Sequence, residues 1–367
     1  MKRRLCIALL LAAMIAVPAL AAAQGAVYTA TNDAAGNQIL IFYRGADGRI
    51  TPAGASATDG LGTGGGLGNQ GGVVLTRDGS WLLVVNAGSD DVSVFRVTDD
   101  GLQLTSRTPS GGRQPVSVTV SNDLVYVLNA GGNVGDVDNI AGFRLSLAGQ
   151  LQPIAGSARP LSAANTSPAQ VGFSPNGAFL VVTEKTTNLI DVFAVNDDGT
   201  ATGPQVFPSA GPTPFGFAFG KRQRLFVSEA AGGALDASSA SAYRLDKDGT
   251  LTLIQGPVPT TETAACWLVV SKDGQFAYVT NTGSGSISGY RVGRDGTLTL
   301  LDADGRTGET GPGTGPIDMA FSANDHYLYV LKSNGSVSAF VVQKDGGLAP
   351  LQTAGGLPPS ANGLAAQ

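Results

Sequence analysis

The chain has 367 residues and a formal net charge of −5, and only 14% of its residues are charged. Such a sparsely charged acidic chain is a poor partner for nucleic acid or an anionic membrane, so neither is expected. Its 52 glycines occur together with many Val, Leu, Phe and Tyr residues, which favours numerous short strands joined by turns over a disordered chain.

The first 23 residues have the pattern of a secretory signal peptide. Three basic residues at 2–4 precede an apolar run from Leu5, and small residues occupy 18–23 at the spacing of a cleavage site. The run is shorter than the ~20 apolar residues that span a membrane comfortably. We therefore expect cleavage near residues 21–24 and an exported mature chain, periplasmic or secreted. Loss of the three basic residues changes the formal charge from −5 to −8.

Cysteine usage excludes an internal disulfide in the mature chain. Cys6 is removed with the signal peptide, which leaves Cys266 alone. Stability must then come from burial of a core, and Cys266 beside Trp267 is interpreted as a small buried hydrophobic residue.

Seven copies of one hairpin unit follow in the chain. Each has a strand of largely apolar residues, a short polar turn and a second strand rich in β-branched and aromatic residues. The copy at 272–292 reads KDGQFAYVTNTGSGSISGYRV, with Asp273-Gly274 as a tight turn before its first strand. In chain order the copies lie at 26–44, 81–97, 124–145, 179–195, 224–245, 272–292 and 326–342.

Two further strands flank each hairpin. An apolar run such as 169–174 precedes it, and a run such as 297–300 follows a second turn. The second turn recurs as Asp-Gly at 47–48, 100–101, 198–199, 248–249, 295–296 and 345–346. Four strands in a repeat of about 40 to 50 residues predict propeller blades. The expected fold class is all-β, a seven-bladed β-propeller of four-stranded antiparallel blades.

The first copy leaves no room for an innermost strand of its own. Residues 358–366 resemble the strand that precedes the hairpin in other blades, such as 167–173. We expect this C-terminal strand to complete blade one and close the ring, because closure removes open sheet edges. The signal peptide at 1–23 would then be followed by one propeller domain at 24–367.

Two segments suggest ligand binding only weakly. The glycine-rich run at 60–72 (GLGTGGGLGNQGG) is not followed by a helix, so it lacks the phosphate-binding mechanism and is interpreted as an inter-blade loop. The acidic segment 135–139 lacks the ligand spacing and terminal glutamate of a calcium loop. No cofactor and no metal are predicted, and calcium binding near Asp136 is left open.

One position in each hairpin lies seven residues after the glycine, or the residue in its place, of the turn that precedes the hairpin. These positions are equivalent from blade to blade. These positions should end the second strand of each blade and form a ring around one mouth of the channel. They hold Asn86, Asn129, Glu184, Glu229, Asn281 and Lys332, with Thr31 or Asn32 in the first blade. Asparagine commonly caps hairpins, so the asparagines can be structural or ligand-binding.

Glu184 and Glu229 are the predicted catalytic residues. Asn86, Asn129, Asn281 and Lys332 are the predicted ligand-binding residues. Two carboxylates on neighbouring blades should raise each other's proton affinity, which suits one of them to act as a base.

The motif YVTN at 278–281, the sequence NAGS at 86–89 and the Asp-Gly turns resemble the seven-bladed propeller lactonase family. That family includes bacterial 6-phosphogluconolactonase and fungal carboxymuconate cyclase, and the resemblance covers essentially all of the mature sequence. It implies an active site at one channel mouth with a histidine, two arginines and a glutamate.

The sequence matches that family site only in part. Glu184, in VVTEKTTNLIDVF, corresponds to the family's glutamate. Val116 and Ala169 follow prolines where the family has histidine or arginine, and Thr282 stands after YVTN instead of arginine. The only histidine, His326, lies in a turn. Recognition of a phosphosugar is therefore disfavoured.

Two classes of function follow from these observations. The first is an exported hydrolase that opens a sugar or organic-acid lactone with Glu184 as the base. The alternative is a non-catalytic propeller that binds a small ligand or a protein partner at the same mouth. The sequence leaves open the substrate, the catalytic activity and the oligomeric state.

Overall fold

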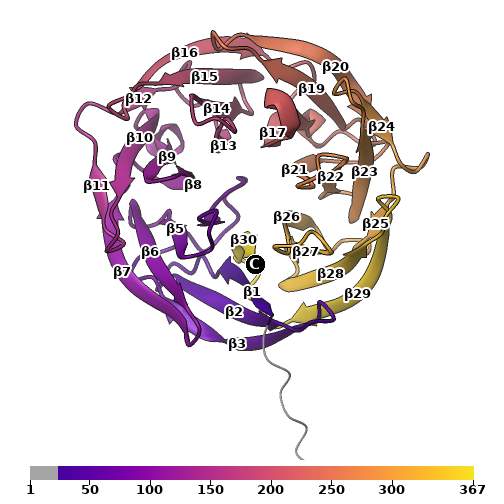
Figure 1. Ribbon diagram of the computed structural model, residues 1–367, viewed down its shortest axis with the longest axis horizontal. Helices are drawn as coiled ribbons and strands as arrows, with labels where there is room; N and C mark the ends of the chain where they lie inside the picture. The colour runs from indigo at the N-terminus through magenta and orange to yellow at the C-terminus, as the bar shows by residue number, and fades with distance from the viewer. Residues whose placement is uncertain (1–23) are drawn as a thin grey trace, which may run out of the picture.

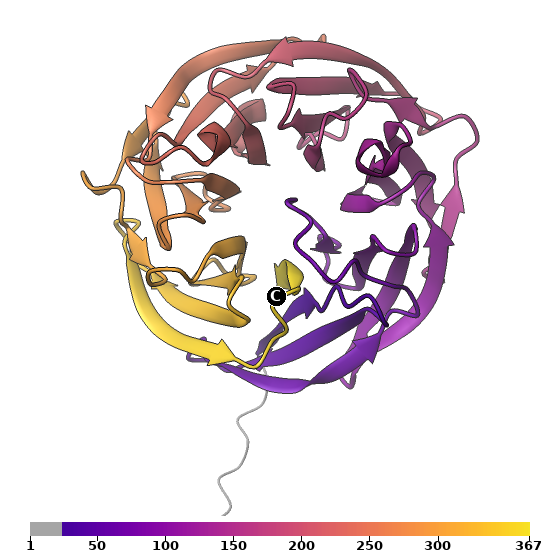
Figure 2. The same ribbon diagram turned by 180° about the vertical axis from the view of Figure 1, so that it is seen from behind.

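The structure, a computed structural model, describes residues 24–367 and shows seven blades around a central channel (Figures 1 and 2). The predicted fold class is confirmed. The predicted signal peptide lies outside the described residues. Within residues 24–367, no helix is both long enough and apolar enough to cross a membrane.

The blades are antiparallel sheets whose strands follow one another from the channel outwards. In this order, blade 1 contains β30 (Asn362–Ala366), β1 (Gly25–Ala30), β2 (Gln38–Arg44) and β3 (Ile50–Ala57). Blade 2 contains β4 (Val73–Leu75), β5 (Trp81–Asn86), β6 (Asp91–Thr98) and β7 (Gly101–Pro109). Blade 3 contains β8 (Pro115–Ser121), β9 (Leu124–Ala130), β10 (Asp138–Leu145), β11 (Leu151–Pro153) and β12 (Arg159–Pro160). Blade 4 contains β13 (Pro168–Phe173), β14 (Phe179–Glu184), β15 (Leu189–Val195) and β16 (Ala201–Pro208).

The remaining three blades repeat this order. Blade 5 contains β17 (Pro214–Phe219), β18 (Arg224–Glu229), β19 (Ser239–Leu245) and β20 (Leu251–Pro259). Blade 6 contains β21 (Ala265–Val270), β22 (Phe276–Asn281), β23 (Ser286–Val292), β24 (Leu298–Leu300) and β25 (Gly308–Glu309). Blade 7 contains β26 (Pro316–Phe321), β27 (Tyr327–Lys332), β28 (Ser336–Val342) and β29 (Leu348–Gly355). Three single-turn 3-10 helices lie in the turns of the described chain, namely η1 (Gly131–Val134), η2 (Lys221–Gln223) and η3 (Ala231–Gly233).

The recurring Asp-Gly turn packs against the tyrosine of the preceding blade. Tyr126 donates its hydroxyl to the carbonyl of Gly199 at 2.8 Å, and the same contact joins Tyr278 to Gly346 at 2.7 Å. A Cβ added at Gly346 would lie 2.4 Å from the ring of Phe276. The turn glycine has a positive φ of 98° there, so both its conformation and its lack of a side chain are needed. The two sequence signals of the repeat are therefore partners across the blade interface.

Closure of the ring is also as predicted. Strand β30 pairs antiparallel with β1, with Val27 opposite Ala366 and Thr29 opposite Leu364. Arg44 fastens both chain segments, because its guanidinium donates to the carbonyls of Gln24 at 2.6 Å and of Gln367 at 3.1 Å. The C-terminal strand is thus the innermost strand of blade 1.

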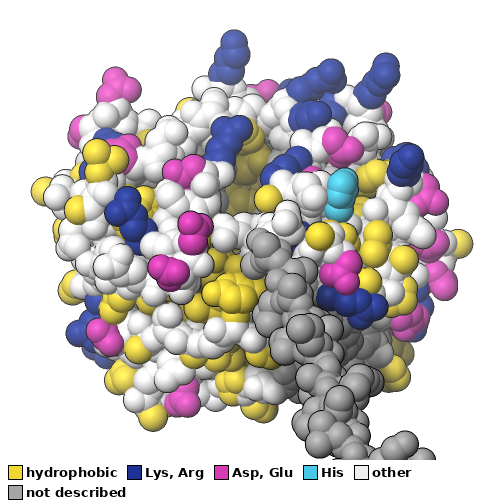
Figure 3. All heavy atoms as spheres, turned by 60° about the horizontal axis from the view of Figure 1, so that its bottom comes forward, with side chains coloured by type: hydrophobic (Ala, Val, Ile, Leu, Met, Phe, Trp, Pro, Cys, Tyr) yellow, Lys and Arg dark blue, Asp and Glu magenta, His cyan; other side chains and the backbone are white. Residues whose placement is uncertain are grey.

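The two ends of the channel differ in the loops that surround them. At one end, which we call the crossing face, the chain passes from each blade to the next and also turns from each second strand to each third strand. At the other end, which we call the turn face, lie the tight glycine-containing turns. In the tilted view of Figure 3 the surface is hollowed at its centre, and hydrophobic side chains line the hollow.

Candidate functional site

Five of the six predicted ring residues end the second strand of their blade, at the crossing face, and Asn129 stands one residue before the end of β9. Glu184, for example, lies opposite Pro168, the first residue of the innermost strand, and Glu229 lies opposite Pro214 in the same way. Five of the six are fully buried, and Lys332 is 4% exposed. The positions therefore share one end of the propeller, but their side chains are closed off from solvent.

The side chains of Asn86 and Asn281 point towards the third strand of their blade. Asn86 donates to Asp91 at 2.7 Å and to Ser93 at 2.8 Å, both on β6. Asn281 donates to Ser286 at 3.0 Å and to Ser288 at 2.9 Å on β23. These contacts fix the hairpins.

Asn129 binds the crossing loop before its blade instead, by donating to the carbonyl of Ser110 at 3.3 Å. In blade 1 the side chain of Asn32 donates to the carbonyl of Gly65 at 2.6 Å. The amide positions of the ring thus hold turns and crossing loops in place.

The side chain of Glu229 points towards β19, the third strand of its blade. Its carboxylate accepts hydrogen bonds from Ser239, from Ser241 at 2.5 Å and from the N–H of Gly211 at 3.0 Å. Burial raises the pKa of Glu229, and the two serine hydroxyls and the Gly211 N–H oppose that rise. A Cβ at Gly211 would lie 2.4 Å from Glu229 Oε2, so the crossing loop covers the carboxylate with a glycine.

Glu184 is paired with another carboxyl group, but its partner is Asp191 and not Glu229. The N–H of Ser162 donates to Glu184 Oε1 at 3.1 Å and to Asp191 Oδ2 at 3.0 Å. The other Glu184 oxygen accepts from Ser162 Oγ at 2.6 Å and from Thr187 Oγ1 at 2.5 Å. Burial, followed by the charge of Glu184, raises the pKa of Asp191 to about 8. The raised pKa favours the protonated form of Asp191 beside Glu184, inside blade 4.

Lys332 is the basic residue among the six ring residues. No hydrogen bond or ion pair reaches its Nζ from residues 24–367, and burial lowers its pKa. Its predicted role as a ligand-binding residue stays a prediction.

The cation that reaches the channel mouth is Lys185, the residue after Glu184. Lys185 is the first residue beyond β14, and its contacts are with an innermost strand and with the crossing loop before blade 2. Lys185 Nζ lies 4.8 Å from the centre of the Phe215 ring and donates to the carbonyl of Gly68. Burial lowers its pKa to about 8. Lys185 is not among the residues predicted from the sequence, although its charge and its position directly after Glu184 are a signal for it.

An aromatic pair lies beside Lys185. The rings of Phe215 and Trp267 are 4.9 Å apart, and they pack with Cys266 and Ala169 in one buried cluster. Trp267 is 4% exposed, and its Nε1–H has no hydrogen-bond partner within residues 24–367. Cys266 is buried as predicted, and burial raises its pKa to about 11. The crossing-face end of the channel therefore combines a cation, a free N–H donor and flat apolar rings.

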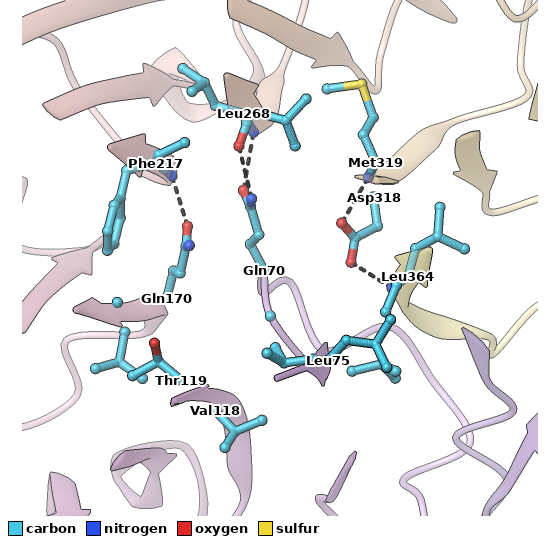
Figure 4. A pocket seen from close by; sticks show the side chains of 18 of the residues that line it. Gln70, Leu75, Val118, Thr119, Gln170, Phe217, Leu268, Asp318, Met319 and Leu364 are labelled. Atoms are coloured by element: carbon cyan, nitrogen blue, oxygen red, sulfur yellow. Dashed lines mark hydrogen bonds between the residues drawn. The ribbon is translucent and has the colours of Figure 1, made fainter. Parts of the chain in front are cut away.

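Side chains of innermost strands bind the backbone of the next blade and form a belt around the channel. The inner edge of each innermost strand has no neighbouring strand, so its N–H groups need other partners. The N–H of Phe217 donates to Gln170 Oε1 at 2.7 Å, and the N–H of Leu364 donates to Asp318 Oδ2 at 3.1 Å (Figure 4). A cavity of about 460 Å³ is lined by Gln170, Asp318 and mainly apolar residues, and extends from this belt towards the turn face.

Asp318 is the carboxyl group of that belt. It is 3% exposed, and within the described chain it accepts hydrogen bonds only from the backbone, at Met319 N (2.7 Å) and Leu364 N. Desolvation by burial raises its pKa to about 8. The sequence does carry a signal for this group, an aspartate inside the otherwise apolar strand PIDMAF, but it is not among the predicted site residues.

The remaining candidates are the residues that replace family site residues and the histidine, and none of them brings a titratable side chain to the mouth. Val116 and Ala169, which replace family site residues, are packed in apolar clusters, and Thr282 donates to the carbonyl of Pro316 at 2.8 Å. His326 lies on the turn face, at the opposite end of the channel, and contacts Asn324 at 3.2 Å. Within residues 24–367, no group of three or more His, Cys, Asp or Glu residues is arranged to hold a metal.

In the acidic segment near Asp136, the carboxylate of Asp138 is bound by hydrogen-bond donors of the protein itself. Asp138 accepts from the N–H of Gly132 at 2.7 Å and from the N–H and hydroxyl of Thr166 at 2.7 and 2.8 Å. Both of its oxygens are therefore used to hold a turn and a crossing loop.

These features define a class of protein, the closed seven-bladed propellers with polar groups gathered at one end of a central channel. A family model described as lactonase, 7-bladed beta-propeller, matches residues 35–158, 133–229 and 220–304. The matches cover more than half of the chain, and the protein belongs to this family.

Solved structures of the same fold agree along nearly the whole chain. The periplasmic gluconolactonase of Pseudomonas aeruginosa has 19% identity and a TM-score of 0.73, over 92% of this chain and 98% of that one. A protein of Lactobacillus plantarum has 19% identity and a TM-score of 0.73, over 94% and 99%. A Bacteroides fragilis protein proposed to be a 6-phosphogluconolactonase has 20% identity and a TM-score of 0.70, over 94% and 98%. These identities establish the shared fold alone. A search of curated proteins found no match.

Proposed function

We propose that this protein hydrolyses a small-molecule lactone, formed from a sugar or an organic acid, at the crossing-face end of its channel. Membership of the lactonase family supports this class of substrate. The observation that carries the proposal is the position of Lys185 against Phe215, next to the unpaired N–H donor of Trp267.

The residues at this mouth match the chemical needs of the reaction. Water adds to the lactone carbonyl carbon, charge develops on the carbonyl oxygen, and the ring C–O bond then breaks to give a hydroxy acid. The N–H of Trp267 is a donor for the developing oxyanion. The rings of Phe215 and Trp267 offer a flat apolar surface for the C–H face of a sugar or acyl ring.

Lys185 is proposed as the base. A lysine with a pKa of about 8 has a substantial neutral fraction near neutral pH. The neutral amine takes a proton from the attacking water and returns it to the ring oxygen when the C–O bond breaks. Turnover should therefore rise with pH through about 8, after subtraction of spontaneous hydrolysis.

The role of Glu184 as base remains a prediction, and the geometry supports a second role for it. Its carboxylate has no exposed surface and shares hydrogen bonds with Ser162 and Thr187. These bonds fix the last residue of β14, so Glu184 can position the adjacent Lys185 through the backbone. Replacement of Glu184 by Gln compares the two roles in the same assay.

The test is hydrolysis of D-glucono-1,5-lactone and of acyl lactones by the purified mature protein. Lys185→Met is expected to abolish turnover without changing the melting temperature. The matched control is Lys344→Met, because Lys344 is exposed on the turn face. Full turnover by Lys185→Met, or absence of turnover with every lactone in the wild-type protein, would contradict the proposal.

Ligand binding without hydrolysis is the second candidate function. The observation that favours it is that both predicted carboxylates, Glu184 and Glu229, are sealed inside their blades. Calorimetric binding of a lactone that the protein leaves intact would support this function over hydrolysis. We also propose that the mature protein is exported, as the pattern at 1–23 predicts.

A further inference from the structure

One crossing loop does not stay on the surface of the propeller. The channel loop, defined as residues 60–72, connects blade 1 to blade 2 and extends towards the centre of the ring (Figures 1 and 2). In the close view, Gln70 reaches from this loop towards Leu268 on the opposite wall (Figure 4). The segment joins two blades as the sequence predicts, and its end lies inside the channel.

The end of the channel loop is held mainly by polar contacts with the mouth. Lys185 donates to the carbonyl of Gly68. The side chain of Asn69 donates to the carbonyl of Val116 and accepts from Asn362 at 2.9 Å. The loop therefore binds the ammonium group of Lys185, which the proposed reaction needs.

Gln70 makes a two-point contact with the backbone of one residue of the channel wall, Leu268. Its Nε2 donates to the carbonyl of Leu268 at 2.8 Å, and its Oε1 accepts from the N–H of Leu268 at 3.0 Å. Gly216 makes room for this contact, since a Cβ there would lie 2.0 Å from Gln70 Oε1. Blades 4 and 7 supply the corresponding acceptor from their own strands, through Gln170 and Asp318. At Leu268 the acceptor comes from the loop.

The composition of the loop makes it easy to displace. Eight of its 13 residues are glycine, and Gly64, Gly68 and Gly71 have positive φ angles. Glycine loses the most conformational freedom when it is ordered, so the closed loop is held against a large entropic cost. Leu61 is 40% exposed, and Leu67 is the loop's partly buried apolar anchor.

We propose that the channel loop is a built-in occupant of the ligand site, and that a lactone with a hydroxyl group next to its carbonyl displaces Gln70. The lactone carbonyl oxygen accepts from Leu268 N–H, and its hydroxyl group donates to Leu268 C=O. Displacement of Gly68 frees Lys185 at the same time. The chemical class of the ligand rests on the proposed function, but the opening of the loop does not.

Cys266 reports on loop opening without any need for activity. It is 8% exposed and is the only cysteine among residues 24–367. Its side chain packs in one cluster with Phe215, and Lys185 joins the Phe215 ring to Gly68 of the loop. The experiment measures the rate at which a thiol reagent labels Cys266. Gln70→Ala should label at least tenfold faster than the wild-type protein, because it loses both contacts with Leu268.

The matched control is Gln352→Ala. Gln352 makes the same two-point contact with Ile50, at 2.9 Å for both bonds, between the outer strands of blades 7 and 1. It should leave the labelling rate unchanged. Equal labelling rates of Gln70→Ala and Gln352→Ala would overturn the proposal.

A measurement on the wild-type protein covers the case in which Gln70→Ala does not fold. Local opening exposes little surface, so its labelling rate should depend weakly on urea, whereas global unfolding gives a steep dependence. Labelling that occurs only with the steep dependence of global unfolding would overturn the proposal.

Binding of D-glucono-1,5-lactam, a non-hydrolysable analogue, tests the ligand. Gln70→Ala should bind it at least tenfold more tightly than the wild-type protein, since it removes the competing occupant. Equal affinity would overturn the assignment of ligand chemistry to Leu268. A protein that opens and binds the lactam but hydrolyses no lactone would contradict the proposed function and leave this inference intact.

Discussion

Replacement of Asp318 by Asn is expected to make the protein less stable at acidic pH and more stable at alkaline pH. The carboxyl group is buried in the channel belt and joins blade 7 to the C-terminal strand through Leu364 N–H. Asn keeps the shape of the side chain, but its NH₂ group cannot accept one of the two backbone hydrogen bonds. The lost bond should cost about 1 kcal/mol at pH 5.

The direction of the pH effect follows from the raised pKa. The folded protein keeps the Asp318 proton until about pH 8, whereas the unfolded chain releases it near 3.8. Between these values the unfolded state binds fewer protons, so the free energy of unfolding falls as pH rises and levels off above 8. The full difference in pKa corresponds to at most about 6 kcal/mol.

Urea unfolding of both proteins at pH 5 and pH 9, followed by tryptophan fluorescence, provides the measurement. The Asn variant should be the less stable protein at pH 5 and the more stable one at pH 9. Asp197→Asn is the control, because Asp197 is exposed. If the difference in free energy of unfolding between wild type and Asp318→Asn is the same at both pH values, the assignment of a buried protonated carboxyl group is wrong.

Three further predictions concern closure, processing and the carboxyl pair. Deletion of residues 358–367 should lower the melting temperature and solubility, because it exposes β1 and β26; an unchanged melting curve would contradict the closure seen in sheet pairing. Mass spectrometry of the secreted protein should find an N-terminus near residues 21–24, and an intact Met1 in the soluble cell fraction would argue against export. Glu184→Gln should lower the melting temperature if Glu184 is structural, whereas loss of turnover at an unchanged melting temperature would identify it as the base.

The blades could be predicted because their determinants are local and repeated. The Asp-Gly turns, the tyrosines of the second strands and the alternation of apolar residues each recur with the same spacing, and the contact of Tyr278 with Gly346 shows why they recur together. Closure was predictable from a missing strand at one end of the repeat and a spare one at the other. The register of the ring positions followed from counting along the strands.

The direction of the ring side chains could not be obtained from that count. Spacing places Glu184 at the end of a strand, but whether it faces the channel or the third strand depends on its partners Ser162 and Asp191, which come from other segments. The next residue, Lys185, has the inward direction. Gln70 escaped prediction for another reason, since a glycine-rich loop has no periodicity from which its path can be inferred.

Ring closure by β30 also sets the order in which the protein can acquire its structure. A ribosome makes β1 first and β30 after more than 300 further residues, yet the two are neighbours in one sheet. Six blades can be completed during synthesis, and blade 1 can form β1 to β3, but the channel has no complete wall until residues 362–366 emerge. The slow step of folding should therefore be a single late docking event with very large sequence separation. Until that event the inner edge of β1 stays open, and this edge is where a chaperone or a second nascent chain would bind.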